Sequence, residues 1–135
     1  MKDLDTKKFV KILNLLNIKS GDNLLVNSDI LKILLKYKET ISPEEMIDTL
    51  KKTISEKGNL IFPTYNWDFC KGKTFKYLET KSSSGALSNL SLKMSDFRRS
   101  ANPIYSFSIF GKDKNYISSL KHLSCFGLDS PFGYL

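Results

Sequence analysis

Residues 42–63, with the sequence SPEEMIDTLKKTISEKGNLIFP, contain the clearest structural signals in the chain. Ser42 is the predicted N-cap of a helix, a proline occupies the first helical position, and Glu45 completes a capping box. Apolar residues follow at helical spacing, namely Met46, Ile47, Leu50 and Ile54. Gly58 is the expected stop of this helix. Residues 59–62 (Asn-Leu-Ile-Phe) then predict a strand, which a proline ends.

On the N-terminal side, the pattern predicts another helix, a strand and a further helix. Residues 5–18 form an amphipathic helix whose apolar stripe is Phe9, Ile12, Leu13 and Leu16. Residues 23–26 read as a short buried strand. The side-chain oxygens of residues 27–29 (Asn-Ser-Asp) can cap a helix that runs to about Tyr37.

On the C-terminal side, a long irregular segment covers residues 64–84 and is rich in aromatic, lysine and serine residues. A loop of this length in a compact domain is usually functional or flexible. A short helix over 85–94, a strand over 104–110 and a helix over 112–120 follow. This order predicts one α/β domain over residues 1–135, with a layered, mostly parallel sheet and flanking helices. The chain stops in loop-like sequence, so the fold is expected to be incomplete at its C-terminus.

Composition narrows the class of protein without deciding it. The chain has 135 residues and a formal net charge of +7. It has no apolar stretch of bilayer length and no signal-peptide pattern, so we expect a cytoplasmic protein that binds no membrane. The lysines are scattered and no nucleic-acid-binding motif is present, which leaves a solvated basic face as the simplest interpretation. The two cysteines have no metal-ligand spacing, and no metal site is expected.

Two segments are candidates for chemistry. The turn at 27–29 is either a plain helix cap or a phosphate site at a helix N-terminus. Residues 98–106 (RRSANPIYS) offer paired arginines and hydroxyls, which suit a phosphate or carboxylate; a solvated basic turn is the alternative. No GxGxxG or GxxxxGK[ST] motif is present. His122, the only histidine, has no partner at metal-ligand spacing and is not assigned a catalytic role.

Taken together, six segments resemble the aminoglycoside 3-N-acetyltransferase family in the correct order. They are GDNLLVNS (21–28), SPEEMIDTL (42–50), GNLIFPTY (58–65), SGALS (84–88), RSANPIYS (99–106) and FGLDSPFG (126–133). The family's Met-Gly-Ala-Leu, Arg-Ser-x-His-Pro-x-x-Ser and Gly-x-x-Ser-Pro-Phe-Gly patterns are similar to the last three. The chain is therefore identified as similar to the N-terminal part of such an enzyme, and a segment at 66–72 resembles relatives that assemble bacterial surface sugars.

This resemblance implies an acetyl-CoA-dependent transferase that acetylates an amino group of an aminoglycoside or a nucleotide-linked amino sugar, as in antibiotic resistance or surface-sugar assembly. The amine attacks the thioester, so a base and oxyanion donors are required. The coenzyme-binding residues that the resemblance implies are Asn27, Ser28, Asp29, Arg99, Ser100 and Ser106. Those implied for the acceptor are Thr64, Tyr65 and Asn102. Acetyl-CoA and the acceptor are the expected small-molecule partners, and no nucleic acid is expected.

The departures from the family pattern leave a second interpretation open. Asn102 occupies the position of the family's characteristic histidine, and asparagine cannot move a proton at neutral pH. The family's later Leu-His-hydrophobic-Ala-Glu stretch is not in this sequence, so the catalytic residue is unknown. The alternative is a catalytically inactive coenzyme- or sugar-binding remnant that needs a partner. A sheet with an unpaired edge also favours a homodimer.

Overall fold

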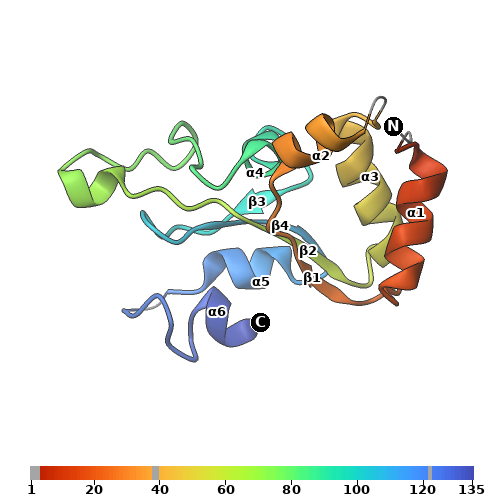
Figure 1. Ribbon diagram of the computed structural model, residues 1–135. Coiled ribbons are helices and arrows are strands. Elements are labelled where there is room, and N and C mark those ends of the chain that lie inside the picture. The colour runs from red at the N-terminus through yellow and green to blue at the C-terminus, as the bar shows by residue number, and fades with distance from the viewer. Residues whose placement is uncertain (1–3, 38–39, 122) are drawn as a thin grey trace.

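The computed structural model describes residues 4–37, 40–121 and 123–135, and the two figures of the whole chain show three layers. A sheet lies in the middle, with α2–α4 over one face, α1 beside α3, and α5 and α6 over the other face (Figure 1). The elements are α1 Thr6–Leu15, β1 Asn23–Leu25, α2 Ile30–Lys36, α3 Pro43–Ile54, β2 Asn59–Pro63, the 3-10 helix η1 Asp68–Lys71, α4 Ala86–Ser91, β3 Arg98–Arg99, β4 Phe107–Gly111, α5 Lys114–Ser119 and α6 Pro131–Tyr134. The predicted α/β class with flanking helices is confirmed.

The sheet is mixed, so the prediction of a mostly parallel sheet is wrong. In the described residues its strand order is β1-β2-β4-β3, and only β1 and β2 pair in parallel. The two-residue strand β3, which the sequence pattern did not reveal, forms a hairpin with β4. A connection this short can join only antiparallel strands. β4 therefore runs antiparallel to β3, and it also pairs antiparallel with β2.

β2 is the central strand, and its side chains are buried on both faces of the sheet. Leu60 and Phe62 pack with the residues of α3 and α4, whereas Ile61 packs with β4 and α5 on the other face. β1 lies at the edge and is not the buried strand predicted, since Leu25 is 43% exposed. A three-residue edge strand has one neighbour to cover it, while β2 has two.

The helix predictions hold where the signals are local. Ser42 Oγ accepts from Glu45 N and the Glu45 carboxylate accepts from Ser42 N, so the capping box is confirmed. The stop is different: α3 ends at Ile54, and Ser55 takes a positive φ of 58°. Gly58 instead allows a close backbone approach, because a Cβ there would lie 2.3 Å from Asp22 O.

α1 buries a narrower stripe than predicted. Leu13 is buried and Phe9 packs against the same core, which places these two residues, four apart, on the inner face. Ile12 and Leu16 were expected beside them, but they are 38% and 66% exposed. α4 and α5 are shorter than the helices predicted for their segments.

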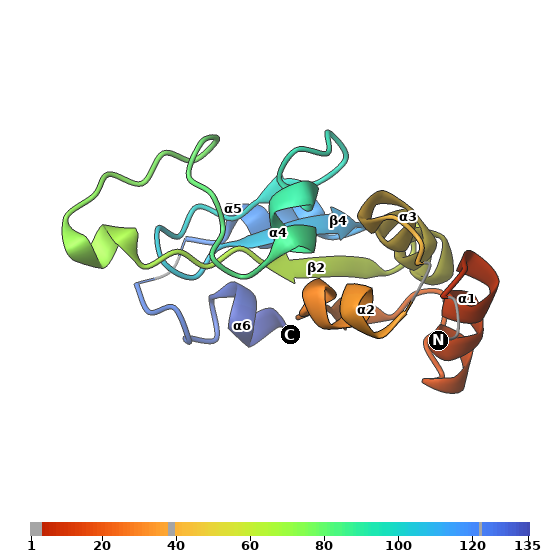
Figure 2. The same ribbon diagram turned by 45° about the horizontal axis from the view of Figure 1, so that its top comes forward.

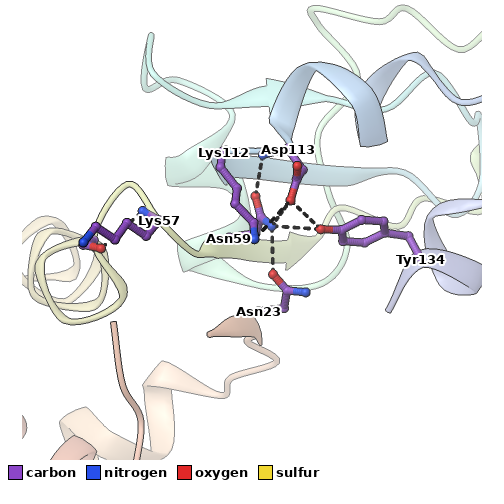
Figure 3. Close-up of polar contacts among 7 residues, drawn as sticks. Asn23, Lys57, Asn59, Lys112, Asp113 and Tyr134 are labelled. Atoms are coloured by element: carbon purple, nitrogen blue, oxygen red, sulfur yellow. Dashed lines mark hydrogen bonds and ion pairs between the residues drawn. The ribbon is translucent and has the colours of Figure 1, made fainter. Parts of the chain in front are cut away.

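A polar network around the buried side chain of Asn59 joins the sheet to α6 at the amino end of β2 (Figure 3). Asn59 is fully buried, and its Nδ2, whose two hydrogens it shares among three oxygens, lies 2.8, 2.9 and 3.1 Å from Asn23 Oδ1, Asp113 Oδ2 and Tyr134 OH. Asn59 Oδ1 accepts from Asp113 N at 2.9 Å, and Tyr134 OH donates to Asp113 Oδ2 at 2.6 Å. The network thus fixes α6, a helix that the sequence pattern did not predict, against β1, β2 and the start of α5.

Candidate functional site

The turn around Ser28 and the segment around Arg99 are linked at the carboxyl end of β2 through residues 84–85 and 64–65. The chain leaving β1 stays beside β2, because Val26 N donates to Ile61 O. The Ser28 carbonyl then lies against Gly85, whose φ is +121° and where a Cβ would be 3.3 Å from that oxygen. α2 and α4, which begin at these points, lie next to each other over one face of the sheet (Figures 1 and 2). Ser84 Oγ, in turn, accepts from Tyr65 N.

Thr64, Ser106 and Arg99 form a buried polar cluster immediately after β2. Their exposed fractions are 0%, 1% and 6%. Ser106 Oγ donates to Thr64 O at 2.9 Å and accepts from Arg99 Nε at 3.0 Å, and it also lies 2.8 Å from Thr64 Oγ1. Burial of the guanidinium lowers the pKa of Arg99. The structure therefore brings together three of the predicted site residues, but it directs their side chains into the protein.

Ser100 and Asn102 build the turn between β3 and β4. Ser100 is 1% exposed, and its Oγ accepts from Phe107 N at 2.9 Å. Asn102 Oδ1 accepts from the backbone N–H groups of Ile104 and Tyr105 at 2.9 and 2.7 Å. Its amide nitrogen donates to Cys125 Sγ at 3.3 Å. At the position of the family's histidine, this chain thus has a side chain that stabilises a turn.

The predicted turn at 27–29 is the most accessible part of the site. Asn27 and Asp29 are exposed, and Ser28 is half-buried. α2 begins at Ile30 and has seven residues, which confirms a helix there. Side-chain capping is not seen, because the Asp29 carboxylate makes no cap hydrogen bond and lies 3.4 Å from Lys32 Nζ.

Tyr65 belongs to an aromatic cluster on the opposite face of the sheet, which sequence reasoning missed. Its ring contacts Tyr105, Phe107 and Phe132 with centroid separations of 5.1, 5.5 and 6.3 Å. Burial and the neighbouring Tyr105 raise the pKa of the Tyr65 hydroxyl. Trp67, 45% exposed, forms the outer edge of the cluster. These residues come from β4, α6 and two loops, so no local pattern could have grouped them.

A cavity near Arg99 and the distribution of metal-ligating and apolar residues also bear on what the protein could bind. A cavity of about 280 Å³ lies beside Arg99 and Ser108, with Tyr77 and Leu78 on one wall. The described residues contain no group of three or more His, Cys, Asp or Glu side chains that could hold a metal. None of the helices in these residues has the length and apolar character needed to cross a bilayer. His122 lies outside the described residues.

Comparison with known proteins gives the family. The description "Aminoglycoside 3-N-acetyltransferase" belongs to a protein family that matches residues 25–135, which is most of the chain. The chain belongs to this family of acyltransferases. No curated protein matches it in sequence.

Solved structures share the fold at low sequence identity. YokD protein from Bacillus subtilis has a TM-score of 0.83 and 22% identity, with 98% of this chain and 61% of that chain covered. AAC-IIIb, solved as a binary complex with CoASH, has a TM-score of 0.83 and 16% identity, with 99% and 56% covered. The H154A mutant of AAC(3)-IVa, in complex with apramycin, has a TM-score of 0.80 and 20% identity, with 98% and 52% covered. The chain thus spans between about half and three fifths of the length of these structures.

Proposed function

We propose that this chain supplies part of an acetyl-CoA-dependent N-acetyltransferase, and that the segments at the carboxyl end of β2 form half of its coenzyme and acceptor pocket. The single observation that carries the proposal is the convergence of the segments around Ser28, Gly85, Tyr65 and Arg99 in a chain of this family. Ligands of open α/β sheets bind beyond the carboxyl ends of the strands. The related AAC-IIIb was solved with CoASH, which supports the same coenzyme here.

Within this half-pocket, the exposed turn at 27–29 is the part available for direct contact with the coenzyme. Asn27 and Asp29 are exposed and Ser28 is partly buried, whereas Ser100 and Ser106 are 1% exposed and bind the backbone of Phe107 and Thr64. We assign Thr64, Tyr65 and Asn102 to the part of the pocket that binds the acceptor. Their backbone and ring positions line the end of β2 and the β3–β4 turn.

The reaction to be served is attack of a neutral amine on the thioester carbonyl. A base must take the ammonium proton, and hydrogen-bond donors must stabilise the oxyanion of the tetrahedral intermediate before the thiolate leaves. We assign no catalytic residue, because Asn102 cannot accept a proton, and its amide oxygen and nitrogen are engaged with the β3–β4 turn and with Cys125.

A nucleotide-linked amino sugar is the acceptor that the charges favour over a polycationic aminoglycoside. Residues 64–84 contain four lysines and two acids, for a net charge of 4 − 2 = +2. Both acids are paired, Asp68 with Lys73 at 3.0 Å and Glu79 with Lys76 at 3.0 Å. A basic surface repels a polycation and attracts a phosphorylated sugar.

Calorimetric titration with CoA, followed by a thiol-release assay with acetyl-CoA, tests the proposal. Saturable CoA binding and thiol release with a nucleotide amino sugar, but not with a gentamicin-type drug, are the expected results. The reverse selectivity would dispose of the nucleotide-sugar acceptor. Absence of saturable CoA binding would dispose of the proposed function.

The second candidate is a coenzyme- or sugar-binding chain without catalysis of its own. The observation that favours it is the use of Asn102 in the β3–β4 turn, at the position of the family's histidine. CoA binding without thiol release for any amino sugar would support this candidate over the first.

Assembly and location complete the proposal. Residues 1–135 form one domain, equivalent to the N-terminal part of the family fold, and act in the cytoplasm. The free edge of β1 and the exposed Leu25 favour pairing of two copies. Sedimentation of the dilute protein checks this: a dimer is expected, and a stable monomer would contradict it.

A further inference from the structure

Arg99 is an arginine of an edge strand that is almost completely buried without a counter-ion. It is 6% exposed, and none of the carboxylates in the described residues forms an ion pair with it. Arginine stays charged at neutral pH, and a buried charge needs hydrogen bonds to replace its lost hydration. The partners of Arg99 therefore define its role.

These partners are protein groups from three separate segments. Arg99 Nη1 donates to Thr80 O at 2.6 Å and Tyr77 O at 3.2 Å, and Nη2 donates to Thr64 O at 3.3 Å. Nε donates to Ser106 Oγ at 3.0 Å. The guanidinium also lies 4.9 Å from the centre of the ring of Phe75.

The segment at 74–80 depends on this arginine for its position. Its other hydrogen bonds and its ion pair are internal, such as Lys76 N to Thr80 Oγ1. Within the described residues, its hydrogen bonds to the rest of the protein all involve Arg99: two carbonyls accept from the guanidinium, and Tyr77 OH donates to Arg99 O. The segment thereby covers the outer edge of β3.

We infer that Arg99 is a positioning residue. It fixes segment 74–80 and the Thr64 end of β2 in the backbone conformation that binds the coenzyme. It acts through these segments and does not touch the coenzyme, in contrast to the role that the family resemblance implies. The planar guanidinium suits this task, because its N–H groups donate to several carbonyl oxygens at once in a fixed geometry. The part of this inference that concerns CoA binding rests on the proposed function.

The experiment compares Arg99→Lys with Arg98→Lys. Arg98 is the neighbouring residue of β3; it is exposed, and its Nη1 donates to Asn115 Oδ1 at 3.0 Å. Hydrogen exchange followed by mass spectrometry is measured on the free proteins, and CoA affinity is measured by calorimetry at low and high salt. Lysine keeps the charge but loses the fork, so the variant is chosen to keep the fold.

The expected result is exchange in residues 74–80 that rises about tenfold in Arg99→Lys, which is the effect of losing one ordinary charged hydrogen bond. Exchange in α3 stays unchanged, and so does every readout in Arg98→Lys. CoA affinity falls in Arg99→Lys with an unchanged salt dependence. Added ethylguanidinium restores protection of 74–80 in Arg99→Ala, whose side-chain space it fills.

Other outcomes overturn the inference. Unchanged exchange at 74–80 in Arg99→Lys would show that the arginine does not hold the segment. A weaker, less salt-dependent CoA affinity with a protected segment would show direct contact between Arg99 and a coenzyme phosphate. If the unmodified protein fails to bind CoA, the proposed function fails, while the exchange data still decide whether Arg99 holds the segment.

Discussion

The two ends of β2 each carry a polar centre built around a buried side chain, and the two centres hold different kinds of structure. At the amino end, Asn59 joins β1 to Asp113 and Tyr134 of the α5–α6 region (Figure 3). At the carboxyl end, Arg99 joins β2 to a loop segment that has no other hydrogen bonds to the rest of the described protein. The first centre should therefore affect global stability alone, whereas the second should also control local opening of the site.

Replacement of Asn59 by Leu breaks the amino-end centre and should have the largest effect. The change leaves Asp113 N and the Asp113 carboxylate without the partners that Asn59 supplies. We expect the free energy of unfolding to fall by about 3 kcal/mol, which urea denaturation measures. Asn115→Ala, at an exposed position, is the matched control and should change it by less than about 0.5 kcal/mol. Equal effects of the two changes would contradict the comparison.

Ser106→Ala weakens the carboxyl-end centre by removing the acceptor of Arg99 Nε and the donor to Thr64 O. We expect a loss of about 2 kcal/mol in unfolding free energy, together with faster exchange at 74–80. Ser119→Ala removes an exposed hydroxyl that donates to Tyr116 O, and it serves as the control. Slower or unchanged exchange at 74–80 would separate Ser106 from the Arg99 centre.

Tyr77→Phe sharpens the comparison, because it deletes only the bond from Tyr77 OH to Arg99 O. The guanidinium contacts remain, so segment 74–80 should open about threefold to tenfold more often, equivalent to roughly 1 kcal/mol. Global unfolding in urea should stay at its original midpoint. Hydrogen exchange of the segment measures the first quantity, and a shift of the midpoint as large as that of Ser106→Ala would argue against a local role.

Acid titration should show the smallest effect, at the amino-end centre. Hydrogen bonds from Tyr134 and Asn59 hold the pKa of Asp113 below its ordinary value. Because the folded pKa is the lower one, this stabilisation is present above about pH 4 and is lost as the pH falls through the folded pKa. It amounts to less than about 1 kcal/mol, since the carboxylate is partly exposed. In Asp113→Asn, this part of the pH dependence should vanish from urea midpoints measured at pH 2–6; an unchanged slope would contradict it.

Local signals in the sequence were sufficient for the α/β class and for several elements. The capping box of Ser42 and Glu45 is confirmed because it is a contact between residues three apart. The strand at 59–62 is confirmed as β2, since its apolar run matches a strand buried on both faces. Both features depend on residues that are close in the chain.

Features that depend on residues far apart in the chain could not be predicted from the sequence. β3 has two residues, so the antiparallel direction of β4 has no periodic signal. α6 is stabilised by Tyr134, whose partners Asn59 and Asp113 lie 75 and 21 residues away. The family resemblance singled out Arg99, but the partners of its side chain, and therefore its orientation into the protein, depend on the fold.

The most direct test of a half-pocket at the carboxyl end of β2 is hydrogen exchange of the protein with and without saturating CoA. The account predicts added protection in peptides that cover residues 27–30, 64–66 and 84–88, with no change around Asn59 and Tyr134. Protection confined to the amino-end centre, or none in these three segments while CoA is bound, would contradict it.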